Sequence, residues 1–290
     1  MKNLLIVDGM ALLFRHYFAT AMNHHFMRNS EGIATNGVQG FIRHVASAIK
    51  DAEADHVIVT WDMGAVTFRN TISADYKSHR PAPPDELNPQ FEMVQRLSEE
   101  LGFFNIGVRN YEADDVIGTI ADKLKSRFQI KVISGDRDLL QLLDDGIEIW
   151  LIKKGFTEYN KYDVRRFREE YGIEPKQLID VKAFMGDTSD GYPGVKGIGE
   201  KTALKFIQTY GSVKNTLAHK KELPKGQQNK IDMFYEDLII SHQLAAIHTE
   251  VPLDLEHISS SMCYTLDIDK MSMICDQHEL KVASNFLLKL

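Results

Sequence analysis

Three of the apolar runs in this sequence end in an aspartate, namely Asp8, Asp62 and Asp136. Short apolar runs bounded by polar residues are typical of buried strands. In sheets of parallel strands, functional groups gather where the carboxyl ends of the strands meet. We therefore expect these three carboxylates to lie together at one edge of a sheet.

Further acidic residues lie in three local motifs, Glu112-Ala113-Asp114-Asp115, Asp136-Arg137-Asp138 and Asp187-Thr188-Ser189-Asp190. In the first and third motifs, the outer acids are three positions apart, a spacing that places two side chains on one helix face. Each motif also has a simpler explanation, respectively a helix cap, an ion pair within a turn, and an Asx turn. None of these explains why acids recur at several strand ends.

Carboxylates crowded into one crevice repel one another and raise one another's pKa unless cations neutralise them. Hydrolysis of a phosphodiester uses two divalent ions about 3.5–4 Å apart to activate water and stabilise the leaving oxygen. Mg²⁺ prefers oxygen ligands and keeps several of its waters. The acids predict a site for two Mg²⁺ or Mn²⁺ ions, with nine candidate ligands: Asp8, Asp62, Glu112, Asp114, Asp115, Asp136, Asp138, Asp187 and Asp190.

A glycine-rich string follows the last acidic motif, Gly194-Val195-Lys196-Gly197-Ile198-Gly199-Glu200-Lys201-Thr202-Ala203. Glycines allow a tight turn and close backbone approach, and the next helix presents free N–H groups to a phosphate. Such strings also occur in turns that bind nothing. The pattern favours a helix-hairpin-helix motif over residues 186–212 that grips a duplex backbone without reading its sequence. The predicted DNA contacts are Lys196, Gly197, Gly199, Lys201 and Thr202.

Residues 63–85 form the one long irregular insert, ending in Arg80-Pro81-Ala82-Pro83-Pro84. A loop of this length in a compact domain is usually functional or mobile. Its only Lys or Arg residues are Arg69, Lys77 and Arg80, just beyond Asp62. They could be ordinary solvated side chains. In a phosphodiester site, however, such cations hold the scissile phosphate.

The remaining pattern favours an α/β fold with a mostly parallel sheet and helices on both faces. Strands are expected at 4–7, 57–61, 103–108, 130–134 and 147–152, with helices at 10–21, 37–52, 86–101 and 113–128. After residue 160 helical segments dominate, at 162–171, 175–185, 201–210 and 229–247. We predict an α/β core over 1–160 and a helical region over 161–290.

The composition is that of an ordinary globular chain of 290 residues, with 43% hydrophobic and 26% charged residues. The formal charge of −7 does not exclude a nucleic-acid partner, because contacts depend on local charge. No apolar run approaches the roughly 20 residues of a membrane helix, and no secretory signal is evident. Cys263 and Cys275 lack a metal-binding spacing, so we expect free thiols and a cytoplasmic protein.

Together these motifs resemble the 5′ nuclease family, which includes the N-terminal domain of bacterial DNA polymerase I, phage 5′ nucleases and flap endonucleases. The resemblance covers residues 8 to about 212, roughly the first 70% of the chain. It rests on Leu5-Ile6-Val7-Asp8-Gly9, Trp61-Asp62, Tyr111-Glu112-Ala113-Asp114-Asp115, Ser134-Gly135-Asp136-Arg137-Asp138-Leu139, and Gly186-Asp187-Thr188-Ser189-Asp190 with the hairpin after it.

The resemblance implies two ion sites. The first set of acids is Asp8, Asp62, Glu112, Asp114 and Asp115, and the second set is Asp136, Asp138, Asp187 and Asp190. It further implies that residues 63–85 form a helical arch or clamp for a 5′ single strand, in which Lys77 and Arg80 contact the scissile phosphate. The hairpin would hold K⁺ through backbone carbonyls, which we assign to Val195 and Ile198. One departure is Gly191-Tyr192 before Pro193-Gly194, where the family usually has Asn and an aliphatic residue.

We therefore expect a monomeric 5′-3′ exonuclease and flap endonuclease that acts on DNA 5′ flaps, nicks and RNA primers in replication and repair, with no membrane partner. Two alternatives stay open. One is a DNA-junction binding protein with little catalysis, against which all nine acids argue. The other is a single-strand ribonuclease, against which the hairpin argues.

Overall fold

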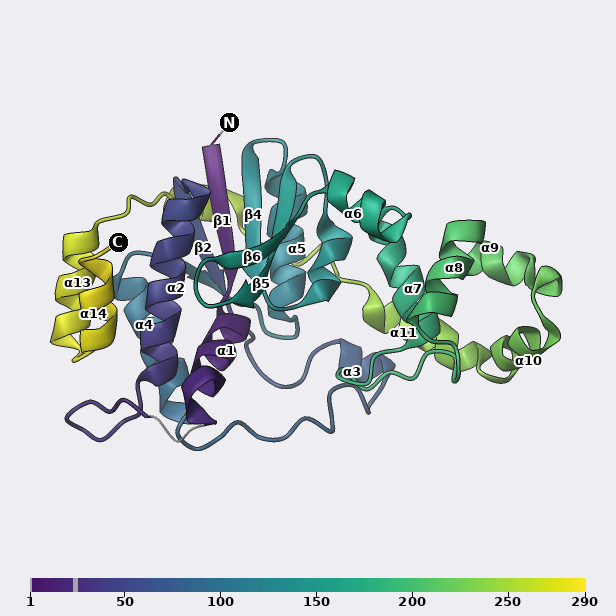
Figure 1. Cartoon of the computed structure of the whole chain (residues 1–290), viewed down its shortest axis with the longest axis horizontal. Coiled ribbons are helices and arrows are strands. Elements are labelled where there is room, and N and C mark those ends of the chain that lie inside the picture. The colour runs from purple at the N-terminus through teal and green to yellow at the C-terminus, as the bar shows by residue number, and fades with distance from the viewer. Residues whose placement is uncertain (1, 23–25) are drawn as a thin grey trace.

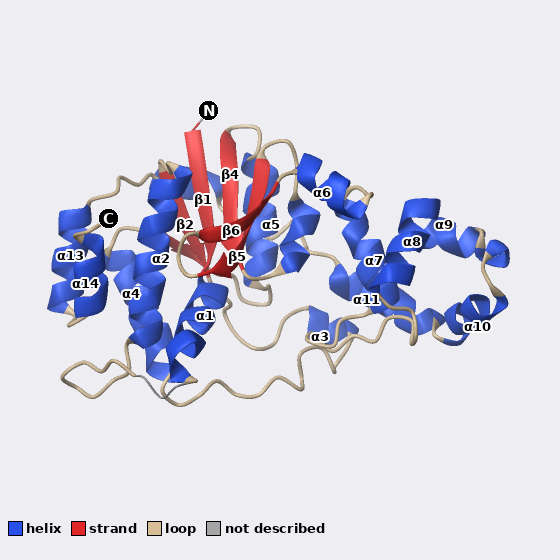
Figure 2. Ribbon diagram, in the orientation of Figure 1, coloured by secondary structure: helices blue, strands red, loops and turns tan. Residues whose placement is uncertain are grey.

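The computed structural model describes residues 2–22 and 26–290. A central sheet lies between two layers of helices, and a helical arm extends from one side of it (Figure 1). Figure 2 shows the strands gathered in that central block, with helices alone in the arm. This arrangement confirms the predicted α/β class with a helical region after the sheet.

The sheet has six strands in the order β3-β2-β1-β4-β5-β6. All neighbouring pairs are parallel except β5 and β6, which form an antiparallel hairpin. The sequence pattern missed β6, because its residues are polar and partly exposed at the sheet edge. The strand bounds are Lys2–Asp8, His56–Thr60, Phe104–Ile106, Phe128–Ser134, Ile147–Lys154 and Glu158–Tyr162, from β1 to β6.

Alternate residues of the central strands pack into two separate hydrophobic clusters, one on each face of the sheet. In β1, Leu4 and Ile6 join one cluster and Leu5 and Val7 join the other, and all four are fully buried. Strands buried on both faces have nearly continuous apolar sequences, which is why these runs could be recognised.

One face of the sheet is covered by α1 (Gly9–Ala21), α2 (Asn36–Ala52), α4 (Asn88–Glu100) and the C-terminal helices α13 (Ile268–Gln277) and α14 (Lys281–Leu287). The other is covered by α5 (Ala113–Leu124) and the 3-10 turn η1 (Arg137–Leu142). In Figure 1, α13 and α14 lie beside α2 and α4, so the end of the chain returns to its first half. The sequence offered no prediction for these last helices.

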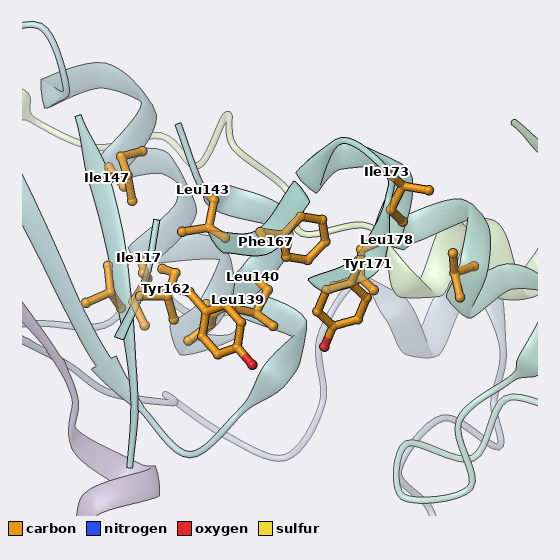
Figure 3. Close-up of a cluster of buried hydrophobic side chains, with 14 of the residues drawn as sticks. Ile117, Leu139, Leu140, Leu143, Ile147, Tyr162, Phe167, Tyr171, Ile173 and Leu178 are labelled. Carbon is orange, nitrogen blue, oxygen red and sulfur yellow. The ribbon is translucent and has the colours of Figure 1, made fainter. Parts of the chain in front are cut away.

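The hydrophobic cluster on the α5 face continues into the helical region (Figure 3). Its members in Figure 3 run from Ile117 and Leu139, near the sheet, to Phe167 and Leu178, at the start of the arm. The stacked rings of Phe167 and Tyr171 are part of this bridge. This shared core fixes the position of the arm's first helices relative to the sheet.

The arm contains α6 (Val164–Tyr171), η2 (Pro175–Gln177), α7 (Leu178–Met185), α8 (Glu200–Tyr210), α9 (Val213–Ala218), η3 (Lys220–Glu222), α10 (Lys225–Met233) and α11 (Tyr235–Ala245). The single helix predicted over 229–247 was wrong, because Phe234 leaves the helical conformation and separates α10 from α11. Helix α12 (Leu255–Ser261) leads back toward the sheet.

The insert at 63–85 contains only one short helix, α3 (Arg69–Ile72), followed by turns and an irregular proline-rich segment. A mainly helical arch is therefore not what the structure shows. Successive prolines lack the N–H groups that a helix needs, which keeps the second half of the insert extended. The segment nevertheless crosses from the sheet to the arm (Figure 1).

Among the described residues, no helix has the length and apolar character to cross a membrane. Cys263 is exposed and Cys275 is buried, and neither forms a disulfide, as expected.

Candidate metal centre and nucleic-acid interface

A cleft of about 500 Å³ lies at the carboxyl edge of the sheet. Eight of the nine predicted acids line it: Asp8, Asp62, Glu112, Asp114, Asp136, Asp138, Asp187 and Asp190. Four basic side chains line it as well: Lys77, Arg80, Arg137 and Lys182. The formal charge of the lining is therefore −4, which two divalent ions would neutralise.

Strand ends and helix starts position the first group of acids. Asp8 is the last residue of β1, and its Oδ1 accepts the Ala11 N–H at 2.9 Å, which caps α1. Ser134, the last residue of β4, donates its hydroxyl to Asp8 Oδ2 at 2.6 Å. Asp62 follows β2 and accepts the N–H of Ala113 at 2.8 Å. Backbone and hydroxyl donors thus fix these carboxylates at the sheet edge.

The second group comes from turns. Asp136 begins η1, and its Oδ1 accepts the N–H of Asp138 at 2.8 Å. Asp187 follows α7, and its Oδ1 accepts the N–H of Ser189 at 2.7 Å. These local bonds are the Asx-type turns that were an alternative explanation for the motifs. These turns are compatible with a role in the cleft, because each uses only one oxygen of its carboxylate and leaves the other for a further partner.

The pKa values show how crowded the first group is. Burial, together with the charges of Asp62 and Asp136, raises the pKa of Asp8 to about 6, although hydrogen bonds from Ser134 and Ala11 oppose the shift. Burial also raises the pKa of Asp114 well above its usual value, helped by Asp136 and Asp8. No basic side chain in residues 2–22 and 26–290 forms an ion pair with Asp8, Asp62 or Asp114. The opposing charge that acts on Asp114 is Lys77, which lowers its pKa without forming an ion pair with it.

Residues of the insert reach across the cleft. Lys77 Nζ lies 2.7 Å from Glu112 Oε1, and Arg80 Nη2 lies 2.6 Å from Asp190 Oδ1. The buried hydroxyl of Tyr76 donates to Glu112 at 3.1 Å and faces Asp190 at 3.3 Å. Lys77 has a left-handed backbone with φ of 54°, held by its N–H bond to the Asp190 carbonyl. Such constrained conformations concentrate at functional sites.

Lys182, on α7, bridges two acids of the second group. Its ammonium lies 2.6 Å from Asp138 Oδ1 and forms a second ion pair with Asp187. Burial, together with Asp136, raises the pKa of Asp138 to about 6, although Lys182 opposes the shift. Burial would also raise the pKa of Asp187, but bonds from Lys182 and Ser189 lower it to about 2. Lys182 was not among the predicted site residues, although a lysine inside the apolar helix that leads to Asp187 was a usable signal.

Asp115 is a correction to the predicted set, because its carboxylate points away from the cleft. It is fully buried, and Arg69 binds both of its oxygens at 2.7 and 2.8 Å. The N–H groups of Glu112 and His248 fill its remaining acceptor positions. The capping explanation therefore holds for Asp115, and no oxygen remains for an ion.

Arg69 is likewise removed from the predicted DNA contacts. Only 2% of it is exposed, and its guanidinium also donates to the carbonyls of Leu244 and Ala246. Asp115 and Glu112 raise its pKa even though burial acts in the opposite direction. It ties the insert to the end of α11.

The chemistry of the cleft fits divalent ions, although its present geometry is not a closed cage. Among the described residues, no three of the acidic side chains are arranged to hold one ion directly. Mg²⁺ binds proteins through one or two carboxylates and several waters, so a wide, oxygen-lined cleft is suitable. Lys77, Arg80 and Lys182 also occupy oxygens that an ion would use.

The predicted hairpin lies between α7 and α8. Gly194 has φ of 60°, and a Cβ there would lie 2.3 Å from the Gly186 nitrogen, so only glycine fits. Lys196 and Lys201 are exposed, as are Gly197 and Gly199 at the start of α8. Thr202 is half-buried. Exposed lysines beside a free helix N-terminus form a surface suited to phosphates.

The predicted carbonyl site in the hairpin is more occupied than expected. Val195 and Ile198 are buried, and the Val195 carbonyl accepts the Ile198 N–H at 2.9 Å. Lys230, on α10, donates to the carbonyl of Gly197 at 2.9 Å. Lys230 is a further cation on this surface that the sequence did not indicate, because it is 33 residues away.

Comparison with known proteins agrees with this architecture. Residues 3–172 match the family described as "5'-3' exonuclease, N-terminal resolvase-like domain", and residues 173–265 match "5'-3' exonuclease, C-terminal SAM fold". A 5′-3′ exonuclease of Bacillus subtilis (strain 168) is 48% identical over 289 residues, which cover 100% of this chain and 97% of that protein.

A DNA polymerase I of Bacillus caldotenax is 39% identical, but the 88% of this chain that aligns spans only 29% of that protein. Among solved structures, the phage T5 D15 flap endonuclease in a complex with DNA and metal ions is 25% identical, with a TM-score of 0.68 over 99% of this chain and 98% of that one. The matches cover both the sheet and the arm. The chain therefore belongs to the 5′-3′ exonuclease family.

Proposed function

We propose that this protein is a monomeric, structure-selective 5′ nuclease that hydrolyses DNA at 5′ ends, flaps and RNA primers with two divalent ions, Mg²⁺ or Mn²⁺. One observation carries the proposal. Eight carboxylates from five segments at strand ends, helix starts and turns meet in one cleft whose formal charge is −4. Such a cleft attracts cations and becomes suitable for a phosphate only once they are bound.

When bound, the ions would supply an activated water and stabilise the charge on the leaving oxygen. Asp8, Asp62, Glu112 and Asp114 would hold the first ion. Asp136, Asp138, Asp187 and Asp190 would hold the second. These are the two sets that the family resemblance implies, without Asp115, whose carboxylate is bound by Arg69.

The insert would supply the cations that orient the scissile phosphate. Lys77 and Arg80 lie within the cleft lining, and each is paired with an acid that an ion can neutralise. Once that happens, each basic group is free to bind a phosphate oxygen. Fixed cations of this kind stabilise transition-state charge without reorganisation.

The hairpin would hold the duplex. Lys201 and Thr202 lie in the first turn of α8, where free N–H groups favour a phosphate, and Lys196 lies in the turn before it. A K⁺ ion at the Val195 and Ile198 carbonyls remains part of this proposal. Such an ion would share the turn with the Lys230 ammonium.

The test uses three matched oligonucleotides: a 5′-flap DNA duplex, the same flap strand alone, and a single-stranded RNA of the same sequence. With Mg²⁺ we expect cleavage of the flap duplex near its branch and none in EDTA. Binding of the flap in EDTA without cleavage in Mg²⁺ would instead identify a junction-binding protein. Equal cutting of the single-stranded RNA would identify a ribonuclease that does not need a duplex.

A further inference from the structure

Lys182 lies between two acids of the cleft, Asp138 and Asp187. Its side chain, and those of Asp138 and Asp187, are each about 13–16% exposed. One ammonium therefore neutralises two nearly buried carboxylates that come from different segments, η1 and the turn after α7. Without that ammonium the two negative charges would face each other in a poorly solvated place.

This ammonium occupies carboxylate oxygens that the proposed second ion would use. An ion that bound Asp138 and Asp187 directly would need the oxygens that Nζ now bridges. A lysine and a divalent cation cannot both occupy the position between those oxygens. Lys182 and the second ion are therefore competitors.

The Lys182 side chain has the flexibility and the neighbouring space to move aside when an ion binds. A lysine carries a compact charge on a flexible four-carbon chain, unlike the rigid fork of an arginine. Beside the cleft lies a hollow of about 370 Å³, which Lys182 also lines. Its lining includes the apolar side chains of Leu178, Val181 and Leu204 and the charged side chains of Arg137 and Glu200. The hollow can receive the methylene chain of a displaced lysine.

We propose that Lys182 is a built-in counter-cation of the second carboxylate pair, which holds Asp138 and Asp187 together before the second divalent ion binds and which that ion must displace. This inference rests on the proposed two-ion function. It predicts that Lys182 weakens the second ion's binding and leaves the first ion's binding unchanged.

The experiment measures Mn²⁺ binding to the full chain, without DNA, by isothermal titration calorimetry and by the loss of the free-ion electron paramagnetic resonance signal. The wild type is compared with K182M, which keeps the length of the side chain and removes its charge. The matched control is K214M, which removes the same charge from an exposed lysine on α9. We expect K182M to bind the second ion at least tenfold more tightly, and K214M to match the wild type.

A purely structural role makes a different prediction. If Lys182 only braces the fold, K182M will bind the second ion equally or more weakly, and either result overturns the inference. K182R serves where K182M does not fold without ions. Arginine keeps the charge and grips two carboxylates more firmly, so we expect weaker second-ion binding, and unchanged or tighter binding would contradict us.

Failure of the proposed function looks different. If neither the wild type nor any variant binds a second Mn²⁺ ion, the two-ion site itself is wrong, and the role of Lys182 falls with it. If two ions bind but the affinity for the second ion is the same in the wild type and in K182M, only the inference about Lys182 is wrong.

Discussion

Asp114 and Asp115 are neighbours on α5, but their carboxylates lie in two regions with opposite surroundings. Asp114 faces the cleft, where other acids surround it and no basic side chain of the described residues pairs with it. Asp115 faces inward, where Arg69 and two backbone N–H groups satisfy it completely. The ion pair of Arg69 and Asp115 is complete within the protein, whereas the acids that line the cleft outnumber its basic side chains by eight to four.

The comparison teaches that buried charge alone does not identify a functional acid. Asp115 is the more buried of the two, yet every one of its acceptor positions is taken. What distinguishes Asp114 is that burial and the neighbouring acids raise its pKa while no basic side chain of the described residues forms an ion pair with it, a combination typical of functional sites. Lys77, Arg80 and Lys182 are intermediate cases, since each pairs with an acid of the cleft and itself lines the cleft.

The largest expected effect is on catalysis. Changing Asp114 to Asn should lower kcat/KM on a 5′-flap substrate by roughly three orders of magnitude or more, the scale seen for essential groups of other hydrolases. The ion-free variant should unfold at the same or a higher temperature, because one repelling charge is gone. Asp122→Asn, on the same helix outside the cleft, is the control and should keep its activity. Full activity in D114N would refute the distinction drawn here.

The next effect is on stability. Changing Arg69 to Met should cost about 3–5 kcal/mol of unfolding free energy in urea, because it leaves Asp115 buried and unpaired. The double variant R69M/D115N should cost less than the sum of the two single changes, since the pair is coupled. Additive costs would show that the two residues act independently.

A smaller effect concerns pH. The folded-state pKa of Asp8 and of Asp138 is about 6, above the usual 3.8. These acids therefore favour folding below pH 4 and lose that contribution as pH rises through about 6. Divalent ions should reverse the loss, so added Mg²⁺ should stabilise the protein more at pH 7.5 than at pH 5, by on the order of 2 kcal/mol. Equal stabilisation at both pH values would contradict this.

The measurement is the difference in unfolding free energy with Mg²⁺ and with EDTA at each pH. Taking this difference cancels the contribution of two buried histidines, which changes with pH in the same range. Burial lowers the pKa of His16 and of His44 to about 3, and their rings form a 2.8 Å hydrogen bond inside the α1–α2 layer. This pair stabilises the fold at neutral pH and loses that contribution below about 6.5, with or without ions.

The smallest expected effect lies in the arm. Changing Lys201 to Ala should weaken binding of duplex DNA roughly fivefold and reduce the salt slope of binding by about one, whatever the sequence. Lys281→Ala, on α14 at the far end of the molecule, is the matched control (Figure 1). A sequence-dependent loss in K201A would mean that the hairpin reads bases.

The sequence by itself determined the sheet and the location of the cleft. Continuous apolar runs, such as Leu4 to Val7, predicted the buried strands. The acids that follow these runs, Asp8, Asp62 and Asp136, predicted the edge of the sheet where the cleft lies. These signals are local: a strand buried on both faces must be apolar, and its end must meet the sheet edge. The glycines of the hairpin were recognisable for the same reason, since a left-handed turn restricts the residue type at that position.

Only the tertiary structure decided which charges pair. The spacing of the acids along α5 predicted that Asp115 binds an ion as its neighbours do. Instead, Arg69, 46 residues away, pairs with Asp115 inside the protein. Lys182 and Lys230 likewise gained their roles from segments distant in sequence. The energy of a charge depends on burial and on every other charge nearby, and those quantities exist only once the chain has folded.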